Sequence, residues 1–205
     1  LLLPSEFLHI TEKNGHMQKL DQIVVRKVNE FIIEYMPYEK LGMQFICINL
    51  SAAEFVSNRM PKKLTEYINE NIAEPGRIYF EVTETVAASS KENLRDCMNE
   101  YISMGFGFAL DDFGTGYANI TQAIELPFSL IKIDQSLLTA SPSILKDILH
   151  MMETLNKITL IEGVETKELL DMIDQIDSGL VQGFYFARPM DIPSLLSFLK
   201  DYNHN

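Results

Sequence analysis

The sequence predicts an α/β domain built as a (β/α)8 TIM-like barrel that is truncated at its amino end and lacks the first strand. Short apolar runs alternate with segments of helical periodicity along the 205 residues, which is the pattern of a parallel sheet wrapped by helices. The length is about one strand and helix short of the roughly 250 residues that such a barrel usually takes. We therefore expect residues 1–205 to form a single domain that starts after the first strand.

Six apolar runs are the predicted strands, because they are short and are bounded by glycine or polar residues. In chain order they cover residues 44–50, 77–82, 107–110, 130–133, 158–161 and 181–186. Apolar residues at spacings of three and four predict a helix before the first run. Its buried side is expected to carry Leu20, Ile23, Val24, Val28, Phe31, Ile32 and Tyr35. Ser141 followed by Pro142 predicts the start of another helix.

The composition excludes several classes of protein. A formal net charge of −12 argues against a DNA or RNA polymer as partner, because such binders work through a basic surface. No apolar run approaches the roughly eighteen residues of a membrane helix. Cys47 and Cys97 have neither the spacing of a metal site nor the density of a disulfide framework. We expect a cytoplasmic domain. A membrane or sensor segment upstream of this domain is compatible with the sequence.

Polar residues stand at the ends of the predicted strands. They are Asn49, Glu81, Asp111, Asp112, Lys132, Glu162 and Gln182. The carboxyl ends of barrel strands face one mouth, so we expect these side chains to converge. The carboxylates among them would raise one another's pKa unless cations lay between them. Hard oxygen ligands suit Mg²⁺ or Mn²⁺, and a two-metal site would stabilise the oxygens of a phosphodiester during its cleavage.

Each of these residues also has a structural explanation. A strand-end aspartate is often a turn or helix-cap residue, Asn49 can cap a following helix, and Lys132 can pair with Asp134. Six successive strand ends with polar residues favour a functional site, because polar side chains inside a barrel cost free energy without a partner. On this view Lys132 orients the attacking water, and Glu162 helps to hold a metal ion or its water.

The segment from Asp111 to Gly116 adds a loop signal. Gly114 and Gly116 permit a tight turn directly after the two aspartates. The segment lacks the lysine and the spacing of a P-loop, so it is weak support for a phosphate-binding loop. A structural turn that holds Asp112 is an equally good interpretation.

Seven short segments spread over the chain carry a family resemblance. They are Pro4-Ser5-Glu6-Phe7-Leu8, Asn49-Leu50-Ser51, Glu81-Val82-Thr83-Glu84, Asp111-Asp112-Phe113-Gly114-Thr115-Gly116, Lys132-Ile133-Asp134, Glu162-Gly163-Val164-Glu165-Thr166 and Gln182-Gly183-Phe184. With these segments the sequence resembles the EAL family of cyclic di-GMP phosphodiesterases over nearly the whole chain. The last segment has Phe184 where the family has tyrosine.

The resemblance implies metal-dependent hydrolysis of cyclic di-GMP to the linear dinucleotide pGpG. The implied metal ligands are Asn49, Glu81, Asp111, Asp112 and Glu162. Lys132, Glu162 and Asp112 would be catalytic. The residues expected to contact the substrate are Gln182, Asp134 and Pro189. The residues expected to steady the loop after Asp112 are Glu84, Glu165, Gly114, Thr115 and Gly116.

One departure from the family concerns the glutamate of the motif that names it. That glutamate belongs on the first strand, so its position would precede Leu1. We therefore expect weak or no turnover by this chain alone. The unpaired strand edges left by a missing strand favour a homodimer. A sensory or diguanylate cyclase domain upstream in the parent protein is compatible with the resemblance.

Two other functions fit parts of the sequence less well. A receptor that holds cyclic di-GMP without cleaving it would be expected to have lost an acid, Lys132 or the Asp111–Gly116 loop, and all of these are present. An enzyme that abstracts a proton beside a carboxylate would need lysine or histidine bases near the metal. The four histidines lie away from the strand ends, which disfavours that chemistry.

Overall fold

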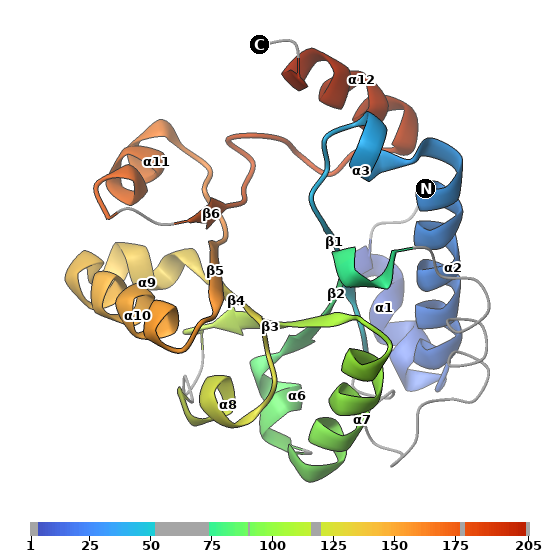
Figure 1. Ribbon diagram of the computed structural model, residues 1–205, viewed down its shortest axis with the longest axis horizontal. Coiled ribbons are helices and arrows are strands. Elements are labelled where there is room, and N and C mark those ends of the chain that lie inside the picture. Colours follow the sequence, from blue (N-terminus) through green and yellow to red (C-terminus); the bar gives the residue numbers. More distant parts are fainter. Residues whose placement is uncertain (1–3, 52–73, 90, 116–119, 177–178, 204–205) are drawn as a thin grey trace. The chain divides into compact units, whose positions relative to one another are not determined.

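The computed structural model describes residues 4–51, 74–89, 91–115, 120–176 and 179–203 (Figure 1). Within these ranges the strands form a sheet in the order of the chain, β1-β2-β3-β4-β5-β6. The strands are β1 (Ile46–Asn49), β2 (Ile78–Thr83), β3 (Gly107–Phe113), β4 (Leu130–Ile133), β5 (Ile158–Ile161) and β6 (Leu180–Val181). The pairings of β3 with β4, of β4 with β5 and of β5 with β6 are parallel, as predicted.

Helices lie between consecutive strands, because parallel neighbours require a long crossover connection. The helices are α1 (Pro4–Lys13), α2 (Met17–Tyr35), α3 (Pro37–Lys40), the 3₁₀ helix η1 (Pro75–Arg77), α6 (Glu84–Ser89), α7 (Lys91–Ser103), α8 (Ile120–Glu125), α9 (Gln135–Ala140), α10 (Pro142–Thr154), α11 (Lys167–Asp174) and α12 (Ile192–Asn203). As predicted, Ser141 and Pro142 start α10. Thr166 caps α11 by accepting a hydrogen bond from the backbone of Leu169.

The chain divides into two compact units. The first contains Leu1–Phe80 and Ser90–Phe106, and the second contains Glu81–Ser89 and Gly107–Asn205. In the first unit an aromatic cluster is buried, with the ring of Phe80 centred 5.0 Å from the rings of both Tyr101 and Phe106.

The buried side of α2 differs from the predicted stripe. Phe31 and Ile32 are buried as expected and the other residues of the predicted stripe are half-buried, but the remaining fully buried residues are Asp21, Val25 and Asn29. Residues spaced by four along a helix share one face, so Asp21, Val25 and Asn29 define the buried side. Two of these three are polar, which is why the hydrophobic pattern alone placed the stripe one residue away.

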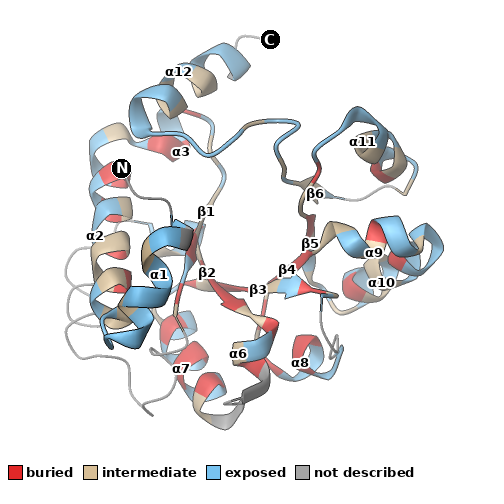
Figure 2. Ribbon diagram, turned by 180° about the vertical axis from the view of Figure 1, so that it is seen from behind, coloured by how far each residue is buried: buried red, intermediate tan, exposed pale blue. Residues whose placement is uncertain are grey.

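The second unit is built on β3, β4 and β5. Figure 2 shows buried residues along these strands and on α9 and α10. All four residues of β4 are buried, as expected for a central strand of a parallel sheet that is covered on both faces. Lys132 is one of these four residues, with only 4% of its surface exposed. The core of the sheet therefore encloses a charged side chain.

β4 and β5 match their predicted limits and β1 and β2 lie within two residues of theirs, whereas the other two predicted strands differ more. β3 continues beyond residue 110 through Asp111 and Asp112 to Phe113. The prediction of a strand over 181–186 is wrong for residues 182–186, because β6 ends at Val181 and the backbone turns there. The amide of Phe186 donates to the carbonyl of Gly183, and the apolar run that indicated a strand is exposed in this turn.

Candidate active site

The candidate active site of the second unit starts from the ends of four strands. Glu81 lies on β2, Asp111 and Asp112 lie on β3, Lys132 lies on β4, and Glu162 directly follows β5. The amide of Glu162 donates to the carbonyl of Ile133 (2.8 Å), which continues the pairing of β4 with β5. Parallel pairing in register thus brings these side chains to one end of the sheet.

Lys132 is the centre of the site. Its Nζ lies 2.7 Å from Glu81 Oε1, 2.7 Å from Asp111 Oδ1 and 2.8 Å from Glu162 Oε1. An ammonium group has three N–H donors, and each faces a different carboxylate here. The alternative in which Lys132 pairs with Asp134 is wrong, because Asp134 instead caps α9 by accepting a hydrogen bond from the backbone of Ser136 (2.8 Å).

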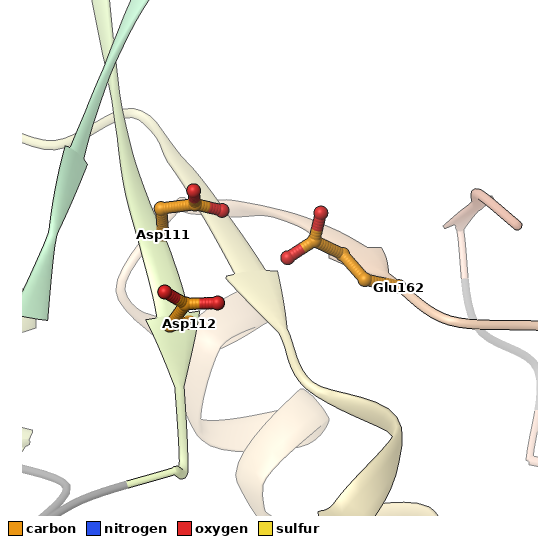
Figure 3. A group of neighbouring side chains, drawn as sticks. All are labelled: Asp111, Asp112 and Glu162. Carbon is orange, nitrogen blue, oxygen red and sulfur yellow. The ribbon is translucent and has the colours of Figure 1, made fainter. Parts of the chain in front are cut away.

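A bulge in β3 allows two consecutive aspartates to serve one site. Successive side chains of a regular strand point to opposite faces. Leu110 pairs with Ile131 and Phe113 with Ile133, so β3 advances three residues while β4 advances two. Asp112 adopts the left-handed conformation (φ 58°) at this point. In Figure 3 the carboxylates of Asp111 and Asp112 accordingly both project from β3 toward Glu162.

Burial, together with the neighbouring charges, shifts the pKa values of the residues in the site. Burial raises the pKa of Glu162 to about 7, although the hydrogen bond from Lys132 lowers it. Burial and the neighbouring charge of Asp111 also raise the pKa of Asp112. Burial lowers the pKa of Lys132, but its hydrogen bonds to Asp111, Glu162 and Glu81 raise it above the ordinary value overall. Lys132 is therefore an ammonium ion at neutral pH.

The donor set fits a hard divalent cation. Oxygen atoms of Asp111, Asp112 and Glu162 all lie within 4.8 Å of one another (Figure 3). Carboxylate oxygens are the ligands that Mg²⁺ and Mn²⁺ prefer. Burial is the main cause of the raised pKa of Asp112 and of Glu162, and the negative charge of Asp111 raises both further. A cation bound here would remove that repulsion.

The loop after β3 forms the predicted turn. Both the amide and the hydroxyl of Thr115 donate to the carbonyl of Asp112 (3.2 and 3.0 Å). Gly114 has φ 105°, and a Cβ atom there would lie 2.3 Å from Leu137 Cδ1 in α9. Only glycine satisfies both conditions. Gly116 lies outside the described residues, so its predicted role is not addressed by the structure.

Three other predicted residues have the following places. Glu84 is the buried first residue of α6, and Glu165 is exposed just before the cap of α11. Their predicted role in steadying the loop after Asp112 stays a prediction. Asn49 is the last residue of β1 and belongs to the first compact unit. Its role as a metal ligand also stays a prediction.

Gln182 and Pro189 share a pocket of about 350 Å³. The backbone N–H of Gln182 donates a hydrogen bond to the carbonyl of Ile161 (2.8 Å), which holds the residue at the end of β5. Two further lining residues had not been predicted as functional. The guanidinium of Arg188 lies over the ring of Phe184, 4.6 Å from its centre, and both residues line the pocket. Phe184 stands where the family has tyrosine, which is a sequence signal for this position, whereas no sequence pattern indicates Arg188.

A larger cavity of about 750 Å³ lies at the other end of β5. Lys157, Ile158 and Thr159 line it, so it opens at the amino end of that strand. Glu162 follows the carboxyl end, and active sites of barrel enzymes lie at the carboxyl ends of their strands. The size of the cavity therefore does not make it the active site.

Comparison with known proteins gives the family. The family model described as "EAL domain" matches residues 1–189. The biofilm architecture maintenance protein MbaA of Vibrio cholerae is 29% identical over 98% of this chain. The cyclic di-GMP phosphodiesterase RocR of Pseudomonas aeruginosa is 25% identical over 97% of it. The chain spans 26% of the length of MbaA and 52% of that of RocR.

A solved structure supports the same assignment. The structure described as "PaMucR Phosphodiesterase, c-di-GMP complex" is 27% identical and superposes with a TM-score of 0.82 over 95% of this chain and 81% of that one. EAL domains have a TIM-like (β/α)8 fold, so the predicted fold class is confirmed. The match of the family model over residues 1–189, together with the acids and the lysine at the strand ends, shows that this chain belongs to the EAL domain family.

Proposed function

We propose that this chain is a cyclic di-GMP phosphodiesterase domain that hydrolyses its substrate to linear pGpG. The observation that carries the proposal is the contact of Lys132 with acids from β2, β3 and the end of β5. RocR, whose name states this activity, and the cyclic di-GMP complex of PaMucR support the choice of substrate. The protein that contains this chain would then lower the concentration of a cyclic dinucleotide.

We propose that Mg²⁺ or Mn²⁺ binds at a two-metal site. Asp111, Asp112 and Glu162 would hold the ions, because their oxygen atoms lie close together. By resemblance to the family, Glu81 and Asn49 would complete the ligand set. Divalent ions would supply positive charge that lowers the pKa of a water molecule and stabilises the phosphate oxygens.

The chain's own residues would perform the remaining steps. Lys132 stays protonated and would present its ammonium group to the attacking water and to the charge that develops on the phosphate. All three of its N–H donors face carboxylates in this structure, so one of them must be released to contact substrate. Glu162, with a pKa of about 7, would accept the proton of the attacking water.

Substrate contacts are proposed for Gln182, Pro189 and Asp134. Gln182 and Pro189 line one pocket that also contains Phe184 and Arg188. The pocket combines apolar surface with a stacked guanidinium, which suits a flat base such as guanine. Asp134 is only partly buried and caps α9 through Oδ1, so we propose that its other carboxylate oxygen accepts a hydrogen bond from the substrate.

Three further properties are proposed for the whole protein. Homodimer formation is supported by Ile120 and Ile124, which lie one turn apart on α8 and are 40% and 54% exposed. A cytoplasmic location fits a nucleotide substrate. Additional sensory or cyclase domains are suggested by longer relatives, two of which are named as an oxygen sensor and as a bifunctional diguanylate cyclase and phosphodiesterase. Within the described residues, no helix is both long and apolar enough to cross a membrane.

The test is hydrolysis of cyclic di-GMP in the presence of Mn²⁺ or Mg²⁺. We would assay this chain and a longer protein that carries further residues before Leu1, and analyse the product for pGpG. In the longer protein, Glu81→Ala should abolish turnover, whereas Glu168→Ala, which changes an exposed acid of α11, should not. Binding without cleavage in the longer protein would instead identify a receptor.

A further inference from the structure

Asp21 of α2 is a buried carboxylate with an unusual partner. Only 4% of the residue is exposed, and its Oδ2 accepts hydrogen bonds from Ser51 Oγ (2.5 Å) and from Ser51 N (3.3 Å). Both residues belong to the first compact unit. In the part of the chain that the structure describes, no cationic side chain forms an ion pair with Asp21. A buried carboxylate without a cation costs free energy, so stability alone does not explain its presence.

The position of Ser51 suggests what the carboxylate does. Ser51 comes two residues after Asn49, the last residue of β1, and Leu50 between them is buried. Because the hydroxyl and the amide of Ser51 donate to the same oxygen, Asp21 fixes both its side chain and its backbone. The backbone at Asn49 is thus held by β1 on one side and by the Asp21–Ser51 contact on the other. The side chain of Asn49 itself remains exposed.

We propose that Asp21 is a positioning residue that, through Ser51, holds Asn49 in the orientation in which it binds a divalent metal ion. This inference rests on the proposed function, in which Asn49 is a metal ligand. Loss of a group that orients a metal ligand typically weakens metal binding by about 10–100-fold. Asp21 acts on the metal only through Asn49, and this dependence can be tested directly.

The experiment is a calorimetric titration of the full chain with Mn²⁺ in the absence of cyclic di-GMP. Asp21→Ala and Ser51→Ala should each weaken Mn²⁺ binding by about tenfold or more. Asp21→Asn should restore binding to near the parent level, because its amide oxygen accepts the same hydrogen bonds. In an Asn49→Ala background, Asp21→Ala should cause no further loss, since coupled residues do not contribute additively.

A control separates positioning from a general loss of stability. Asn29 is a second buried polar residue of α2, only 2% exposed. Asn29→Ala should lower the free energy of unfolding, measured with urea, without changing the affinity for Mn²⁺. If Asp21→Ala behaves in the same way, or weakens Mn²⁺ binding equally with and without Asn49, the inference is wrong.

The outcome can be distinguished from failure of the proposed function. If the chain shows the predicted coupling in Mn²⁺ binding but the longer protein with residues before Leu1 does not hydrolyse cyclic di-GMP, the proposed function is wrong and the role of Asp21 is supported. If the longer protein hydrolyses the dinucleotide but the chain shows no coupling, the role of Asp21 is wrong and the proposed function stands. Absence of any Mn²⁺ binding by the parent chain would overturn the inference.

Discussion

Lys132 Nζ lies 2.7 Å from Asp111 Oδ1 on the neighbouring strand, inside a site where two further carboxylates contact the same ammonium group. Lys132 therefore compensates the negative charge of the metal-free site. Replacement by methionine keeps much of the volume but leaves the acids unpaired. Removing one partner from a buried ion pair costs about 3–5 kcal/mol. We expect Lys132→Met to lower the free energy of unfolding in urea by that amount, and Mn²⁺ to restore part of the loss.

Lys167→Met is the matched control for this prediction. Lys167 forms an ion pair with Asp171 at 2.7 Å, but both side chains are more than half exposed. Such a pair contributes at most about 1 kcal/mol. Equal effects of the two substitutions would show that Lys132 does not neutralise a buried acidic cluster.

The left-handed conformation of Asp112 gives a second prediction. A left-handed residue with a Cβ atom is strained by roughly 1–2 kcal/mol. We expect Asp112→Gly to be more stable than Asp112→Ala by about that amount, while both lose the carboxylate and with it Mn²⁺ affinity. At Asp147, an exposed position within α10, the order should reverse, because glycine is about 1 kcal/mol worse than alanine inside a helix. Urea unfolding of the four variants measures the difference in stability between the glycine and the alanine variant at each position. If glycine is the more stable, or the less stable, of the two at both positions, the left-handed conformation at the bulge is not a source of strain.

The third prediction concerns Gly183, which lies in the turn directly after Gln182. A Cβ atom at Gly183 would lie 2.0 Å from the carbonyl oxygen of Val164, so backbone atoms would have to move. Overpacking of this kind costs about 1–3 kcal/mol. We expect Gly183→Ala to lower stability by at least this amount and, because Gln182 is displaced, to raise KM for cyclic di-GMP. Gly179→Ala should be nearly neutral, since the nearest atom to its Cβ would be 3.9 Å away.

The sequence predicted the strand-end acids and Lys132 because each follows or interrupts a short apolar run, and parallel strands carry their ends to one edge. It did not predict which partners Lys132 takes, since Asp134 is much nearer in sequence than Asp111, and only the fold shows that Asp134 caps α9 instead. The bulge at Asp112 was also missed, because it depends on pairing between β3 and β4. The burial of Asp21 was not predicted for another reason. A charged residue on a helix is expected to be exposed to solvent, and only the fold shows that Ser51 donates a hydrogen bond to it.

Asp21 also predicts how stability depends on pH. Burial raises the pKa of Asp21 above its ordinary value of 3.8, although the hydrogen bonds from Ser51 lower it. The folded state therefore binds the proton of Asp21 more tightly than the unfolded state does. Its favourable contribution is complete below pH 3.8 and is lost as the pH rises through the pKa of the folded state. Asp21→Asn cannot ionise, so its stability relative to the parent should increase from pH 4 to pH 7.

Urea unfolding of the metal-free parent and Asp21→Asn across this range measures the difference, in which contributions from other groups cancel. Ser51→Ala removes a hydrogen bond that lowers the pKa of Asp21, so in this variant the loss of stability should continue to higher pH than in the parent. A stability difference between parent and Asp21→Asn that stays constant with pH would mean that Asp21 has the same pKa in the folded and unfolded states. The carboxylate would then not be desolvated by the fold, and its hydrogen bonds to Ser51 would have to be formed in contact with water.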